Sequence, residues 1–136
     1  MNQVVARYLD GHLLKGHTVD FLPTSDRFHL FPAGSYPGSR PLEIDVHDLK
    51  GIFFVKNLQG NPAHVKRNIF EPTNLTPGKK IRVVFKDGEV LLGHAQGYHP
   101  ERKGFFILPA DQRSNNERCY VVSSATREVS VIASGT

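Results

Sequence analysis

Two short segments near the C-terminal end carry the densest group of side chains that could bind a ligand. They are "GYHPERKGFF" (97–106) and "DQRSNNERCY" (111–120). Guanidinium and ammonium groups hold anions, amides donate hydrogen bonds to them, and an aromatic ring can stack on a flat group. The alternative is that these residues only cap turns and pair with neighbouring charges in solvent. The site predicted here consists of Tyr98, His99, Arg102, Lys103, Arg113, Asn115, Asn116 and Arg118.

Seven histidines raise the question of a metal site. His12 and His17 are five residues apart, as are His94 and His99, and on a strand an odd spacing turns two side chains to opposite faces. No carboxylate or thiolate is placed to complete a ligand set, so we expect no metal and no cofactor. We expect His17 and His94 to support the fold, for instance through a hydrogen bond.

The sequence contains none of the familiar catalytic patterns. We find no nucleophile elbow, no phosphate-binding glycine loop and no metalloprotease helix, and we therefore expect a protein that is not an enzyme. The single cysteine, Cys119, excludes an internal disulfide, and its apolar neighbours predict a buried, inert thiol.

The elements that must position these residues come in two copies. Adding 77 to a residue number in the first half gives its counterpart in the second: Asp10-Gly11 matches Asp87-Gly88, Gly16-His17 matches Gly93-His94, and Pro32-Ala33 matches Pro109-Ala110. Internal duplication is therefore the first organising feature of the chain. We predict a first unit at 1–56, a linker at 57–80 with one turn of helix near 63–66, and a second unit at 81–136.

Within each unit the apolar pattern predicts five short strands. The Asp-Gly pairs predict two-residue hairpin turns, and "RFHLFP" and "GFFILP" predict third strands that end at a proline. Turns near 47–48 and 124–125 separate the last two strands. Gly16 and Gly93 fall in the middle of a strand and predict a sharp bend or a bulge. The expected fold is all-β, with two tandem five-stranded small barrels packed as a pseudo-twofold pair.

Charge and composition limit the classes of partner. The net charge is +4, but 1–60 holds six basic and six acidic residues, and the surplus lies mainly in 61–80, where four basic residues face one acidic residue. This distribution does not predict a basic groove over a folded surface. No apolar run approaches the roughly 20 residues of a membrane span, and the first residues lack the features of a signal peptide. We expect a cytoplasmic protein without a membrane partner.

The order of these features resembles the Sm-like, or SH3-like, small barrel. "DGHLLKGHTVDF" (10–21) is similar to the first Sm motif, and Leu49-Lys50-Gly51 followed by "IFFV" is similar to the second. The resemblance implies ring assembly and binding of single-stranded RNA. Three positions depart from it: no asparagine follows Asp20, Gly97 replaces the equivalent aspartate, and Arg127-Glu128 replaces an arginine-glycine pair.

The second half also resembles a family of uncharacterised bacterial tandem-domain proteins. The likeness rests on the phrase "FKDGE.L.G...GY.P.R.GFF..PAD..SNNER", which spans Phe85 to Arg118. This family implies a domain and no activity. The leading functional hypothesis is a non-enzymatic binding or adaptor module that recognises a protein partner through loops of the second barrel. The alternative is RNA or nucleotide binding of the Sm-like kind.

Overall fold

The chain is an all-β protein in which ten strands form one antiparallel sheet. The structure is a computed structural model that describes residues 2–36, 38–60, 69–70, 76–95 and 97–132. The first five strands are β1 (Asn2–Arg7), β2 (Leu13–Thr18), β3 (Arg27–Pro32), β4 (Leu42–Asp45) and β5 (Gly51–Val55). The other five are β6 (Lys79–Phe85), β7 (Val90–Ala95), β8 (Gly104–Pro109), β9 (Asn116–Val122) and β10 (Thr126–Val131).

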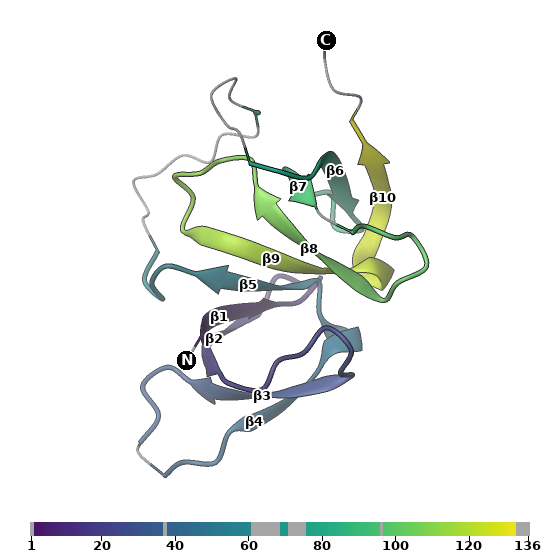
Figure 1. Cartoon of the computed structure of the whole chain (residues 1–136). Coiled ribbons are helices and arrows are strands. Elements are labelled where there is room, and N and C mark those ends of the chain that lie inside the picture. The colour runs from purple at the N-terminus through teal and green to yellow at the C-terminus, as the bar shows by residue number, and fades with distance from the viewer. Residues whose placement is uncertain (1, 37, 61–68, 71–75, 96, 133–136) are drawn as a thin grey trace.

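The order of the strands repeats from one half to the next. The sheet runs β10-β6-β7-β8-β9-β5-β1-β2-β3-β4, so each half has its fifth strand beside its first and its fourth strand last. Figure 1 shows β5 and β9 side by side, where the two halves meet. We call this β5–β9 pairing the seam. It covers two strands that would otherwise be exposed edges, and unpaired edges favour aggregation.

The sheet does not confirm the predicted pair of closed barrels related by a pseudo-twofold axis. It has two free edges, β4 and β10, and therefore does not close. A twofold axis would join equivalent strands, whereas the seam joins the fifth strand of one half to the fourth strand of the other. The halves thus follow one another head to tail within a single sheet.

The Asp-Gly turns lie where the sequence placed them, but their loops have three residues. The backbone amide of Tyr8 donates to the carbonyl of His12, and that of Gly11 donates to Tyr8. Phe85 and Glu89 close the second turn in the same way. Only the glycines take a positive φ, +94° at Gly11 and +93° at Gly88, as expected where a type I turn is followed by one left-handed residue.

The mid-strand glycines let two backbones approach each other closely. Gly16 pairs with Pro32 of β3, and a β-carbon at this position would collide with the carbonyl oxygen of Phe31. Gly93 pairs with Pro109, and a β-carbon there would collide with the carbonyl oxygen of Leu108. The pairing of β2 with β1 and of β7 with β6 continues through these glycines without a bulge, so the structure shows a steric need for glycine at both positions.

The two predicted breaks are 3-10 turns, η1 (Val46–Asp48) and η2 (Ser123–Ala125). The strand β6 begins at Lys79, inside the predicted linker. The predicted turn of helix at 63–66 lies outside the described residues.

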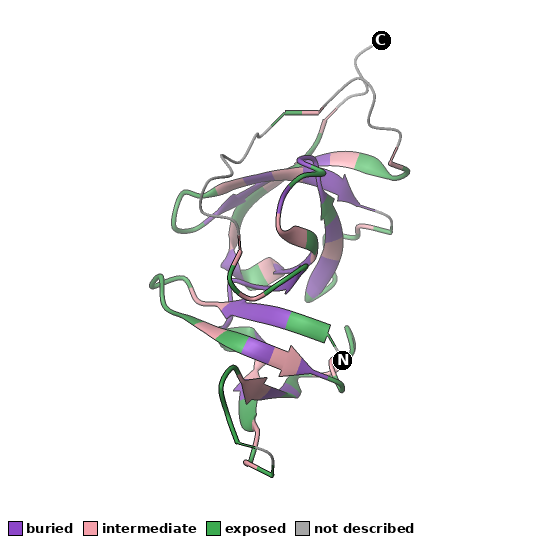
Figure 2. Cartoon of the chain, turned by 90° about the vertical axis from the view of Figure 1, so that its left-hand side faces the viewer, coloured by how far each residue is buried: buried purple, intermediate pink, exposed green. Residues whose placement is uncertain are grey.

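A single apolar core runs through both halves. It includes Phe28, Leu30 and Ile52 from the first half and Phe85 and Ile107 from the second. Figure 2 shows buried residues along the strands of both halves. Such sharing suits units of about fifty residues, since a domain this small buries only about 60% of the surface of its unfolded chain and is marginally stable by itself.

A buried lysine adds polar contacts between the two halves. The Nζ atom of Lys50 lies 2.8 Å from Oδ2 of Asp87 and 2.6 Å from Oε1 of Glu89, and it lies 4.8 Å from the ring centre of Phe85. The hydrogen bond from Lys50 is the main cause that lowers the pKa of Asp87. Lys50 belongs to the first half and its partners to the second, so the ion pairs align the two halves.

No helix long and apolar enough to cross a membrane is present among the described residues.

Candidate functional site

One predicted site residue, Arg118, lies on the seam with its guanidinium group against two aromatic rings. In the β5–β9 register Arg118 is directly opposite Phe54. Its Cζ atom lies 4.2 Å from the ring centre of Phe54 and 4.9 Å from that of Phe106. Phe54 belongs to the first half and Phe106 to the second. The stacking therefore depends on the way in which the two halves join.

Beside Arg118 the sheet surface forms a shallow cavity of about 250 Å³, which we call the Arg118 groove. His94, Phe106, Leu108 and Arg118 line it. Leu108 is 36% exposed and supplies an apolar surface. Within the part of the chain that the structure describes, Arg118 has no carboxylate partner. The groove thus combines a fixed cation with apolar walls, a combination suited to an acidic group next to an apolar one.

His94 forms the buried wall of the groove. Its side chain packs edge-on against Phe70, with the ring centres 5.0 Å apart, and only 3% of the residue is exposed. Burial and then the nearby Lys80 lower the pKa of His94, which favours the neutral ring at neutral pH. Its Nδ1 atom is buried and has no hydrogen-bond partner among the described residues. The predicted hydrogen bond is thus not made by Nδ1.

His17, the copy of His94 in the first half, stacks on Phe31. The ring centres are 5.2 Å apart and the planes are 7° from parallel. The two matching histidines therefore contact different aromatic residues.

The segment between β2 and β3 brings the first half onto the aromatic surface of the second. The ring centre of Phe21 lies 5.1 Å from that of Tyr120 and 6.2 Å from that of Phe106. The hydroxyl group of Tyr120 donates to the carbonyl oxygen of Pro23 at 3.2 Å. Phe106 thus contacts Phe21 and Tyr120 and also lines the Arg118 groove.

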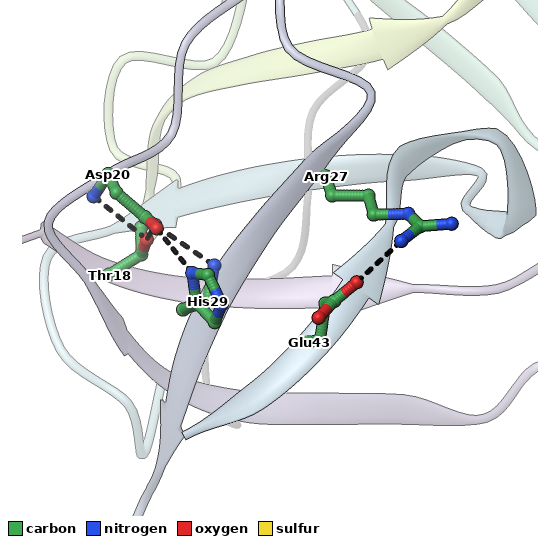
Figure 3. Close-up of polar contacts among 5 residues, drawn as sticks. All are labelled: Thr18, Asp20, Arg27, His29 and Glu43. Atoms are coloured by element: carbon green, nitrogen blue, oxygen red, sulfur yellow. Dashed lines mark hydrogen bonds and ion pairs between the residues drawn. The ribbon is translucent and has the colours of Figure 1, made fainter. Parts of the chain in front are cut away.

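A polar network holds that segment at its N-terminal end, and Figure 3 shows its members pointing toward one another. Oδ1 of Asp20 accepts hydrogen bonds from the backbone amide of His29 at 2.9 Å and from Oγ1 of Thr18 at 3.1 Å. Oδ2 lies 2.6 Å from Nδ1 of His29. Burial acts to raise the pKa of Asp20, but the hydrogen bonds from His29 and Thr18 outweigh it, so the pKa is lowered.

Arg27 and Glu43 form a separate ion pair between β3 and β4 in the same view, at 2.8 Å. Near the C-terminal end of the segment, Asp26 accepts a hydrogen bond from Nζ of Lys103 at 3.0 Å. Asp26 also lies 3.2 Å from Nε2 of His47. The predicted anion-binding cation Lys103 is thus paired with a carboxylate of the first half.

The remaining predicted residues fall into different places on the second half. Tyr98 packs edge-on against Phe105 with the ring centres 4.8 Å apart, and Nδ1 of His99 accepts from the amide of Glu101. Arg102 and Lys103 line a depression of about 460 Å³ together with Pro23, Thr24 and Tyr120.

Asn115 and Asn116 line another cavity at the seam, and Arg113 is exposed near them. The structure therefore brings together Arg102 with Lys103 and Asn115 with Asn116, but it does not gather all eight predicted residues into one site.

Three residues of the Arg118 groove, and the ring that stacks on Arg118 from the first half, were missed by the sequence analysis. Phe106 and Leu108 alternate with Phe105 and Ile107 along β8. One face of this apolar strand therefore packs into the core, and the other lines the groove. The signal was present in the wholly apolar run "FFIL", which implies contacts on both faces. Phe54 and His94 could not be assigned without the pairing of strands.

The described residues hold no group of three or more His, Cys, Asp or Glu side chains that could bind a metal ion. Cys119 is buried, in agreement with the sequence prediction.

Comparison with known proteins adds a family and no activity. No curated protein and no solved structure matches the chain. The model of a family of unknown function, DUF6982, matches residues 1–133. The match covers both halves and the segment between them, and the chain therefore belongs to the DUF6982 family of unknown function.

Proposed function

We propose that the protein is a non-enzymatic binding module in which two tandem small-barrel units present the Arg118 groove to an acidic, partly apolar segment of a protein partner. The observation that carries the proposal is the guanidinium group of Arg118, which packs against the adjoining rings of Phe54 and Phe106 and has no carboxylate partner in the described part of the chain. This proposal narrows the predicted recognition surface from the loops of the second unit to one residue of β9 and its neighbours.

The stacking prepares Arg118 for recognition of a carboxylate. Two rings restrict the rotation of the side chain, so less conformational entropy is lost when a ligand binds. The N–H donors of the guanidinium group lie in its plane and can form two parallel hydrogen bonds to one carboxylate. A water-exposed lysine at this position would offer neither advantage.

The shape of the groove favours a side chain of a peptide over a whole small molecule. A volume of about 250 Å³ is below the roughly 300–1,000 Å³ of common small-molecule pockets. Leu108 offers an apolar contact next to the cation. An aspartate or glutamate beside a leucine or phenylalanine fits both features.

Fluorescence anisotropy with a labelled peptide tests the proposal. The probe alternates leucine and aspartate, and its control carries asparagine in place of aspartate. We expect the acidic peptide to bind and Arg118→Gln to weaken it about tenfold, equivalent to about 1.4 kcal/mol. Leu108→Ser should also weaken it without a change of charge. Arg82→Gln, which removes an exposed cation of β6, serves as the matched control.

Equal binding of the two peptides, or equal affinity of Arg118→Gln and Arg82→Gln, would contradict the proposal. Labelled oligonucleotides measured at two salt concentrations test the alternative of nucleic-acid binding, since phosphate contacts weaken steeply with salt. Salt-sensitive oligonucleotide binding together with no peptide binding would replace the proposed function.

A further inference from the structure

We infer that a second, independent site lies at the seam and binds a small doubly charged oxyanion, such as inorganic phosphate or the phosphate group of a monoester. A cavity of about 320 Å³ opens there. We call it the seam pocket and define it by six of its polar lining residues: Arg7, Lys15, Gln59, Ser114, Asn115 and Asn116.

The first half supplies two cations to the seam pocket. In the β1–β2 register Lys15 is directly opposite Val5, and Arg7 lies two residues further along β1 on the same face. The Cζ atom of Arg7 lies 5.2 Å from the ring centre of Phe53, which holds the guanidinium group in place. Neither cation has a carboxylate partner in the described ranges, and no acidic residue lines the pocket.

The second half supplies neutral donors. Ser114 is only 6% exposed, and its Oγ atom accepts a hydrogen bond from the backbone amide of Asn116 at 3.1 Å. This bond leaves the hydroxyl proton available for another acceptor. The side-chain amide of Asn116 makes no hydrogen bond to the residues described. Both groups can donate to an anion oxygen without adding charge.

Asn115 holds the shape of the pocket, because its side-chain amide bonds to the backbone of Asn57. Its Nδ2 atom donates to the carbonyl oxygen of Asn57 at 2.8 Å, and its Oδ1 atom accepts from the amide of Asn57 at 3.2 Å. Oδ1 of Asn57 in turn accepts from the amide of Gly60 at 2.7 Å. These bonds tie the segment after β5 to the segment before β9, so the two sides of the pocket are held together.

This set of groups suits phosphate better than a single carboxylate. Two cations match a charge near −2, and hydroxyl and amide donors can reach the remaining oxygens. The cations come from the first half and Ser114 and Asn116 from the second. The site is therefore complete only when the halves are joined.

To test the inference, inorganic phosphate is titrated into the full chain at low ionic strength, and the chemical shifts of the backbone amides are measured by NMR. We expect phosphate to shift the amide signals of Gly60, Asn115 and Asn116 in a saturable way, and acetate to bind at least tenfold more weakly. The double variant Arg7→Gln/Lys15→Gln should weaken phosphate binding at least tenfold relative to the charge-matched control Arg82→Gln/Lys86→Gln. Ser114→Ala should weaken it severalfold with the charge unchanged.

The inference is overturned if phosphate causes no saturable shift at these residues, or if the double variant binds phosphate as well as its control. Thermal unfolding of each variant verifies that it is folded. The Arg118→Gln variant should bind phosphate as well as the wild type does. The phosphate site and the proposed peptide site can therefore be contradicted independently of each other.

Discussion

The environment of Arg118 separates this residue from the other basic residues of the second half. Lys103 is paired with Asp26, while Arg118 packs against two rings and lines a groove with the exposed Leu108. Residue type alone predicted both as anion-binding groups. Which cation is paired depends on contacts between the halves, and no local pattern in "DQRSNNERCY" specifies them. The sequence therefore could not show which of the predicted cations is paired with a carboxylate and which lies against aromatic rings.

Asp20 gives a prediction about pH. Its pKa is lowered in the folded chain, so its stabilising contribution is complete above the ordinary aspartate value of about 4 and is lost as the pH falls through the lowered pKa. Replacing Asp20 by asparagine weakens the hydrogen bonds to His29 and Thr18 and should reduce the unfolding free energy at pH 7. The expected loss is only about 1 kcal/mol, because these groups are partly exposed to solvent. Urea unfolding at a series of pH values measures this difference.

The difference between wild type and Asp20→Asn should shrink as the pH falls below about 4. Glu101→Gln, which changes an exposed carboxylate, should leave the unfolding free energy nearly unchanged at both ends of the range. A difference for Asp20→Asn that stays constant down to acid pH would show that the carboxylate charge is not responsible.

The strands and turns were largely predictable because neighbouring residues decide them. The proline-terminated runs gave the bounds of β3 and β8, and the turns at η1 and η2 fall at the predicted breaks. The hairpin loops have three residues instead of two, because glycine alone takes the positive φ while Asp10 and Asp87 do not. Aspartate before glycine marks a turn but does not fix the number of residues in it.

Substitution of the mid-strand glycines tests how the elements are shaped. Gly16→Ala and Gly93→Ala should each lower the unfolding free energy by about 2 kcal/mol, because the new methyl group collides with a backbone carbonyl that cannot move independently. The corresponding fall in Tm is roughly 6 °C. Differential scanning calorimetry measures it, with Arg82→Ala on an exposed position of β6 as the control. A loss no larger than that of the control would mean that β2 and β7 have room for a side chain.

The molecule as a whole depends on a pairing that local sequence could not predict. The β5–β9 register brings Phe54 to Arg118, and the adjoining contacts bring Lys50 to Asp87 and Asn57 to Asn115. Duplication predicted two similar halves, but it did not specify which edges would meet. The halves join fifth strand to fourth. This pairing puts Phe54 against Arg118 of the groove and lines the seam pocket with residues of both halves.

Native-state hydrogen exchange at the seam tests most directly that the two halves form one continuous sheet, on which both proposed sites depend. The amides of Val122 and Lys56 donate across the seam, to the carbonyls of Lys50 at 3.2 Å and Asn115 at 2.9 Å. We predict that Val122 and the other seam-directed amides of β5 and β9 exchange as slowly as the protected amides of β1 and β8. Rapid exchange, at the rate of the free edges β4 and β10, while the interior of each half stays protected, would contradict a continuous sheet and both sites built on it.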